Sequence, residues 1–115
     1  TGAKGLYNYN GIYLVHDRFY EFDEAGLLSL TADFSNKTFS INANSDTTKL
    51  TGSGFLDTSS GQISSTELNF VETGYWSSKA SLLGAVGGRN GSAVSGVWHT
   101  NESSPEYEGS FIGHR

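Results

Sequence analysis

The chain has 115 residues, a length that suits one domain, and no cysteine, which excludes a disulfide framework, a thiolate nucleophile and a cysteine metal site. Its 7 basic and 12 acidic residues give a formal net charge of -5, which argues against nucleic acid as a partner because phosphate backbones demand clustered Lys and Arg. No apolar run reaches about 18 residues, so we expect a protein that does not span a membrane.

The composition favours an extracellular address. Charged residues make up 17% of the chain, and Ser, Thr, Asn and Gly take their place, as is common in secreted and cell-surface β proteins. The chain starts at Thr1 without a visible signal peptide, so we expect a mature or excised segment.

Residues 5–16 are predicted to form the first strand. Tyr7, Tyr9 and Tyr13 share one parity there, so they line either the core or an exposed aromatic stripe. Residues 17–25 are acidic and aromatic, and we interpret them as an ordered connection that could include a short helical turn.

Residues 27–34 and 39–43 are predicted to form a hairpin. Asn36 and its neighbours from 35 to 38 favour a tight turn, because Asn and Ser satisfy local backbone groups. Counting back from that turn places Phe34 opposite Phe39 and Ala32 opposite Ile41.

Two further hairpins and a last strand complete the predicted sheet. Residues 49–57 and 62–71 flank a turn at 58–61, and residues 79–88 and 92–100 flank the Asn90-Gly91 pair, which tolerates positive φ. Residues 102–106 lead into a last strand over 107–114, whose register places Trp98 near Gly109.

These elements predict an all-β fold, a single small eight-stranded antiparallel up-and-down β-barrel over residues 1–115. Glycines recur inside the strands, where a small closed sheet must bend hard or let neighbouring groups approach. The first strand is expected to pair with the last, because closure removes both sheet edges.

Two C-terminal segments combine glycines with aromatic residues at fixed spacing. Residues 84–98 contain Gly84, Gly88, Gly96 and Trp98, and residues 109–115 read Gly-Ser-Phe-Ile-Gly-His-Arg. With residues 30–34, which precede a hairpin, they resemble the barrel signature of transferrin-binding protein B and its lipoprotein relatives. The resemblance implies a barrel and a bacterial cell-surface or outer-membrane setting. It does not imply transferrin binding, because Arg89 and other positions differ from the family pattern.

Catalytic and metal chemistry find little support in the sequence. His16, His99 and His114 are scattered, although His99 is expected to face Glu108 across two strands as a solvent-facing pair. No calcium loop and no Gly-x-Ser-x-Gly motif occur, so we predict no enzyme, no metal and no cofactor.

Aromatic residues in turns give the stronger indication of function. Tyr75 and Trp76 lie in a predicted loop and are residue types favoured at interfaces, although Trp76 could equally close the end of the barrel. Arg89 is a second candidate anchor, at the opposite end of the same strand.

The sequence therefore predicts a non-catalytic binding or assembly module with a protein partner or a second copy of itself. Three other functions stay open: a carrier barrel for a small ligand or haem, a protease-inhibitor barrel, and a structural surface or virion subunit. The large predicted interior residues argue against a roomy carrier, because eight-stranded barrels are only just wide enough to fill with side chains.

Overall fold

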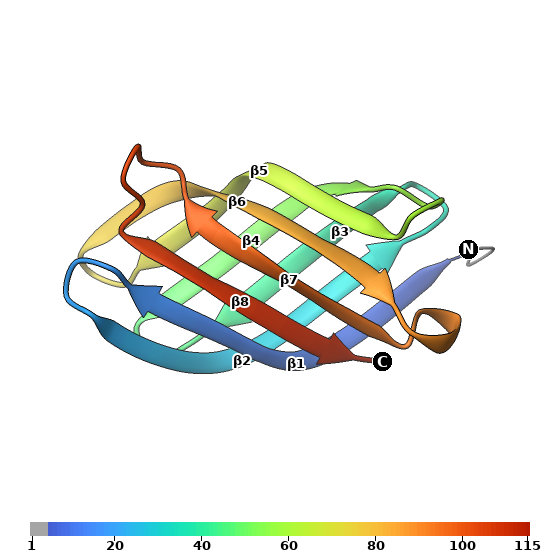
Figure 1. Ribbon diagram of the computed structural model, residues 1–115, viewed down its shortest axis with the longest axis horizontal. Helices are drawn as coiled ribbons and strands as arrows, with labels where there is room; N and C mark the ends of the chain where they lie inside the picture. The colour runs from blue at the N-terminus through green and yellow to red at the C-terminus, as the bar shows by residue number, and fades with distance from the viewer. Residues whose placement is uncertain (1–4) are drawn as a thin grey trace.

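The computed structural model describes residues 5–115, which form a closed barrel of eight antiparallel strands (Figure 1). Each strand pairs with the next along the chain, and β1 pairs with β8. No helix among the described residues is long and apolar enough to cross a membrane. The strands are β1 (Leu6–Asp17), β2 (Phe22–Asp33), β3 (Thr38–Asn44), β4 (Thr48–Leu56), β5 (Gln62–Glu72), β6 (Trp76–Gly87), β7 (Ala93–Thr100) and β8 (Tyr107–His114), with a short 3-10 turn η1 (Arg89–Gly91).

The core is the barrel interior, filled by every second residue of each strand. Trp98 is 2% exposed, and Tyr9 and Tyr13 are fully buried, so the tyrosines of the first strand belong to the core rather than to an exposed stripe. A column of stacked rings runs from one end towards the middle: Trp76, Tyr107, Phe70, Trp98 and Tyr13, with neighbouring centroids 4.6–5.8 Å apart. The predicted strand parity is thus confirmed.

Glycines permit the closure that the sequence predicted. A methyl group at Gly109 would lie 1.9 Å from the Leu14 carbonyl oxygen and 2.7 Å from Trp98 Nε1. Trp98 Nε1 also donates a hydrogen bond to the Leu14 oxygen at 3.3 Å. Strand β8 can therefore pair closely with β1, because Gly109 has no Cβ at the point where the Leu14 carbonyl group and the Trp98 indole approach it.

The β1–β2 connection and the β2–β3 hairpin each differ from the prediction. β2 begins at Phe22, so residues 18–21 are a short turn and not a longer connection with a helical turn. Ala32 lies opposite Phe39 and Leu30 opposite Ile41, a register two residues from the predicted one. The cause is the position of the loop, which spans 34–37 and not 35–38, because the Asp33 carboxylate accepts backbone hydrogen bonds at 3.0 Å from positions 35 and 36. A shift of two preserves parity, so the predicted inward residues are still buried.

Later pairings follow the prediction, with two irregularities. Asn90 and Gly91 have φ of 57° and 66°, and Trp98 lies opposite Gly109. Register shifts between residues 51 and 55 of β4 and between 65 and 68 of β5 mark bulges that the sequence analysis did not place.

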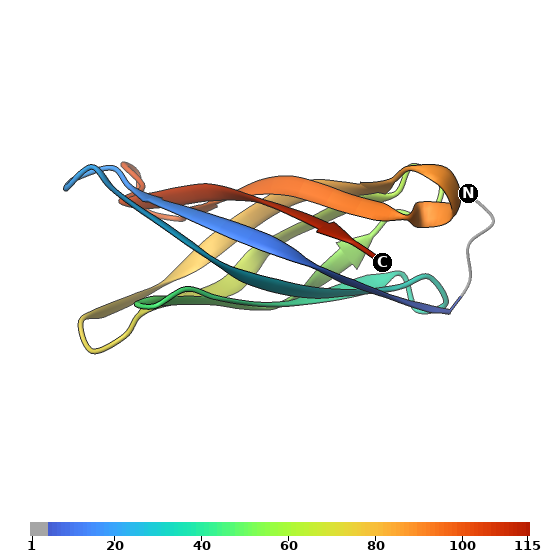
Figure 2. The ribbon, with the colours of Figure 1, turned by 90° about the horizontal axis from the view of Figure 1, so that it is seen from below.

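The two ends of the barrel carry opposite charge. Over the described residues the principal dimensions are 43 × 23 × 19 Å, and Figure 2 shows four hairpin connections gathered at one end. We call residues 17–24, 45–48, 72–76 and 101–108 the acidic rim, and residues 34–37, 57–61, 88–92 and 114–115 the basic rim. Most of the 12 acidic residues of the chain belong to the acidic rim: Asp17, Glu21, Asp23, Glu24, Asp46, Glu72, Glu102, Glu106 and Glu108. The basic rim holds Lys37, Arg89 and Arg115 with one carboxylate, Asp57, and the acidic rim contains one arginine, Arg18.

Candidate binding site at the acidic rim

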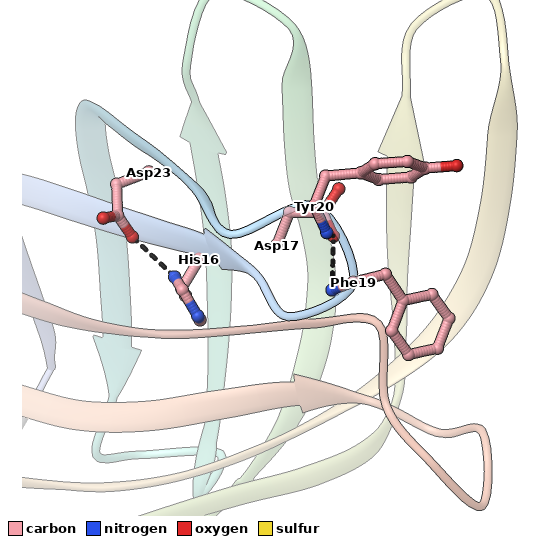
Figure 3. Close-up of polar contacts among 5 residues, drawn as sticks. All are labelled: His16, Asp17, Phe19, Tyr20 and Asp23. Atoms are coloured by element: carbon pink, nitrogen blue, oxygen red, sulfur yellow. Dashed lines mark hydrogen bonds and ion pairs between the residues drawn. The ribbon is translucent and has the colours of Figure 1, made fainter.

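The tip between β1 and β2 presents aromatic side chains to solvent. The Asp17 carboxylate is buried and accepts backbone hydrogen bonds from Phe19 at 3.0 Å and Tyr20 at 3.2 Å, which fixes the turn. Figure 3 shows both rings pointing away from the β1–β2 ribbon. Phe19 is 61% exposed and Tyr20 80% exposed, so the turn holds two apolar surfaces in water.

Polar contacts brace this tip against its neighbours. His16 Nδ1 lies 2.7 Å from Asp23 Oδ1, a contact drawn in Figure 3. The backbone amide of Arg18 donates to the Glu106 carbonyl oxygen at 2.7 Å, and its guanidinium donates to the Pro105 carbonyl oxygen at 3.2 Å. The β1–β2 tip is therefore attached to the loop between β7 and β8 and is held in place.

Tyr75 and Trp76 have different environments. Tyr75 is 85% exposed at the β5–β6 turn, whereas Trp76 is half-buried, with its ring 6.2 Å from Phe70 and 5.8 Å from Tyr107 between centroids. Trp76 closes the barrel end, which is the second of the two roles that the sequence left open. Tyr75 is the member of the pair that a partner can reach.

A pocket of about 380 Å³ opens at the mouth of the barrel beside these tips. Carboxylates of Asp17, Glu24 and Glu72 line it, together with the rings of Tyr20 and Phe22. Its remaining lining residues are Val15, Thr47, Thr48 and Tyr107. Tyr107 belongs to the ring column, so the pocket is a shallow mouth above a packed interior.

The carboxylates at the mouth are crowded. Burial raises the pKa of Glu106, and the neighbouring charges of Asp17, Glu72 and Glu102 raise it further. Burial raises the pKa of the Tyr107 hydroxyl, which is hydrogen-bonded to Glu72. The Oε1 atom of Glu102 is buried and has no hydrogen-bond partner. This part of the rim therefore holds negative charge that the protein itself leaves incompletely compensated.

Glu24 differs from these groups because it has donors of its own. Burial alone would raise its pKa, but hydrogen bonds from Ser45 and Thr47 bring the pKa below the ordinary value. Thr47 donates from its hydroxyl at 2.8 Å and from its backbone amide at 3.1 Å. Glu24 therefore stays ionised and connects β2 to the β3–β4 turn.

The three residues predicted as binding anchors do not form one site. Arg89 lies in η1 on the basic rim, at the far end of the barrel from Tyr75, as the sequence analysis expected from their strand positions. The structure adds Phe19, Tyr20 and Phe22 to the acidic rim, which the sequence analysis treated as a connection. The sequence feature that could have identified these residues is the occurrence of three large aromatic residues within a polar, acidic stretch next to a turn.

The predicted His99–Glu108 pair lies on the outer wall in direct register. His99 Nδ1 hydrogen-bonds to the Thr100 carbonyl oxygen at 2.9 Å. Within residues 5–115, no group of three or more His, Cys, Asp and Glu side chains is placed to hold a metal ion.

Comparison with known proteins gives no family for this chain. No protein-family model matches it, and a search of curated proteins finds no match either.

Proposed function

We propose that the protein is a non-catalytic binding module whose acidic rim engages a cationic, partly apolar segment of a protein partner. The observation that carries the proposal is the set of four exposed rings around a carboxylate-lined mouth: Phe19, Tyr20, Phe22 and Tyr75. Large aromatic side chains in turns supply contact area with few rotatable bonds, which is why interfaces are enriched in them.

Charge defines the chemistry of the partner. Lys or Arg side chains of a partner would meet the carboxylates of Asp17, Glu72 and Glu106, and their charged heads can also lie over tyrosine rings. A bound cation would lower the repulsion from Asp17, Glu72 and Glu102 that helps to raise the pKa of Glu106. An anionic partner would gain none of this.

The packed interior favours binding at the rim over binding inside the barrel. The ring column occupies the space below the mouth, and the mouth pocket has Tyr107 among its lining residues. The resemblance of residues 84–98 and 109–115 to surface lipoprotein barrels supports a bacterial cell-surface or extracellular setting for this interaction.

The proposal is tested with a defined probe. A short fluorescein-labelled peptide that alternates lysine with phenylalanine and leucine is titrated with the protein, beside the same peptide with glutamate in place of lysine. We expect fluorescence anisotropy to show binding of the lysine peptide alone.

Two variants locate the binding. Tyr20→Ser/Tyr75→Ser should weaken it by about 30-fold, since two anchors at an interface together contribute about 2 kcal/mol. Leu6→Ser removes an exposed apolar side chain from the opposite end and should leave binding unchanged. Equal affinity for both peptides, or equal affinity of the two variants, would contradict the proposal.

A further inference from the structure

One side of the outer wall is apolar. Strands β6, β7, β8 and β1 lie on the near side in Figure 1, and their outward residues include several exposed aliphatic side chains. Direct register joins Leu83 to Val97, and Ile112 to Ile12. Val97 and Ile112 are diagonal neighbours, because Ile112 lies opposite Ser95. We call this set the apolar wall: Ile12, Leu14, Leu83, Val97 and Ile112.

The outer face of β3 and of the adjoining part of β2, away from the apolar wall, is polar. The outward residues of β3 are Thr38, Ser40, Asn42 and Asn44, and those of β2 beside them include Ser29 and Thr31. Exposed apolar side chains scattered singly need no explanation, but a continuous set on one side of a small domain marks an interaction surface.

A groove adjoins the apolar wall. It has a volume of about 650 Å³ and lies where the β4 and β5 bulges interrupt the ladder. Leu83 and Val97 of the apolar wall line it on one side, and Phe55 of β4 and Thr38 of β3 line it on the other. Ile12, Leu14 and Ile112 are exposed on the strands that follow around the barrel. One face therefore combines a depression with a neighbouring set of exposed aliphatic side chains.

We infer that the apolar wall is the interface of a homodimer in which two barrels lie side by side with their long axes antiparallel. In a two-fold dimer each residue pair occurs twice, so the groove of one subunit receives the exposed aliphatic side chains of the other and the reverse. The barrel's length of 43 Å and width of 23 Å give one side room for the roughly 800 Å² per partner of a standard interface.

Charge complementarity favours a second copy of the chain as the molecule that covers the apolar wall, and it favours an antiparallel arrangement of the two barrels. A second copy placed antiparallel brings its basic rim, with Lys37, Arg89 and Arg115, beside the acidic rim of the first copy, and this happens at both ends. A parallel arrangement would place the two acidic rims together and would be opposed by like-charge repulsion.

Self-association is measured by sedimentation equilibrium on the wild-type chain, which we expect to dimerise at micromolar concentration. Val97→Lys/Ile112→Lys should raise the dissociation constant by about 100-fold, because it buries unpaired charges at the interface. The matched control Ser40→Lys/Asn42→Lys adds the same charge to the polar side and should dimerise as the wild type does. A wild type that stays monomeric, or wall and control variants of equal dissociation constant, would overturn the inference.

A second measurement needs no interface variant. The natural chain has no cysteine, so Thr73→Cys on the acidic rim and Ser92→Cys on the basic rim can each carry a single spin label. We expect short distances in dimers mixed from the two labelled proteins and longer distances when both subunits carry the same label. Short distances between identical labels would overturn the antiparallel arrangement. The Tyr20→Ser/Tyr75→Ser rim variant should dimerise normally, which separates failure of this inference from failure of the proposed function.

Discussion

The Gly109→Ala substitution tests how the barrel closes. The new methyl carbon would lie 1.9 Å from the Leu14 carbonyl oxygen, far inside van der Waals contact, and 2.7 Å from Trp98 Nε1. Both neighbours are held, one by the β1 backbone and the other by the ring column, so β8 must move away from β1. The Trp98 hydrogen bond to Leu14 is then strained or lost.

The cost follows from these contacts. Overpacking costs about 1–3 kcal/mol and a lost hydrogen bond about 1 kcal/mol, while the lower entropy of the unfolded alanine chain offsets roughly 0.4–1 kcal/mol. We expect a net loss of about 2–3 kcal/mol, which lowers the melting temperature by about 10 °C in a domain of this size.

The assay is urea and thermal unfolding followed by circular dichroism. The matched control is Gly87→Ala, where an added methyl group meets no atom within 4 Å. That variant should be unchanged or more stable by up to about 1 kcal/mol. If Gly109→Ala and Gly87→Ala unfold at the same midpoint, the close approach of β8 to β1 is not what closes the barrel.

Three further outcomes are expected. Trp98→Ala should lower the free energy of unfolding by roughly 3–5 kcal/mol in urea titrations, and a loss below about 1 kcal/mol would contradict its place in the ring column. The native pKa of Glu106 is above its ordinary value of 4.5, so the native state gains stability on protonation and loses it as pH rises through that range. Glu106→Gln should therefore have a higher melting temperature than the wild type at pH 7, and the difference should vanish near pH 4. A difference in melting temperature that does not change with pH would contradict the crowding of carboxylates around Glu106. Duplex DNA should show no binding in a filter assay at physiological salt, and sub-micromolar binding would refute the charge argument.

Local patterns in the sequence were sufficient to predict which residues face inward. Period-two alternation placed Trp98 and Tyr13 inside because parity depends only on neighbouring residues along one strand. The Asn90-Gly91 turn fixed its hairpin, and hence the pairing of β6 with β7, because positive φ at both positions allows few alternatives.

Features that depend on which side chain caps a turn, or on where a strand bulges, were harder to predict. The β2–β3 register differs by two residues from the predicted one because Asp33 caps the turn and places the loop at 34–37, one residue before the predicted turn at 35–38. The bulges in β4 and β5 leave no clear mark in sequences rich in Ser, Thr and Gly.

The candidate site depends on closure, which no local pattern describes. Phe19 and Tyr75 are far apart in the chain, and they belong to one rim only because an up-and-down barrel returns alternate turns to the same end. The same geometry separates the acidic residues from Lys37 and Arg115. Of the four exposed rings of the acidic rim, only Tyr75 was predicted as a binding residue, because Tyr and Trp in a turn are residue types favoured at interfaces.

The most direct test of the account is an NMR titration of the isotope-labelled protein with the lysine-containing peptide. We expect amide shift changes that are confined to the acidic rim, residues 17–24, 45–48, 72–76 and 101–108, and that diminish in the Tyr20→Ser/Tyr75→Ser variant. Shift changes centred on the apolar wall or on the basic rim around Arg89 would contradict it.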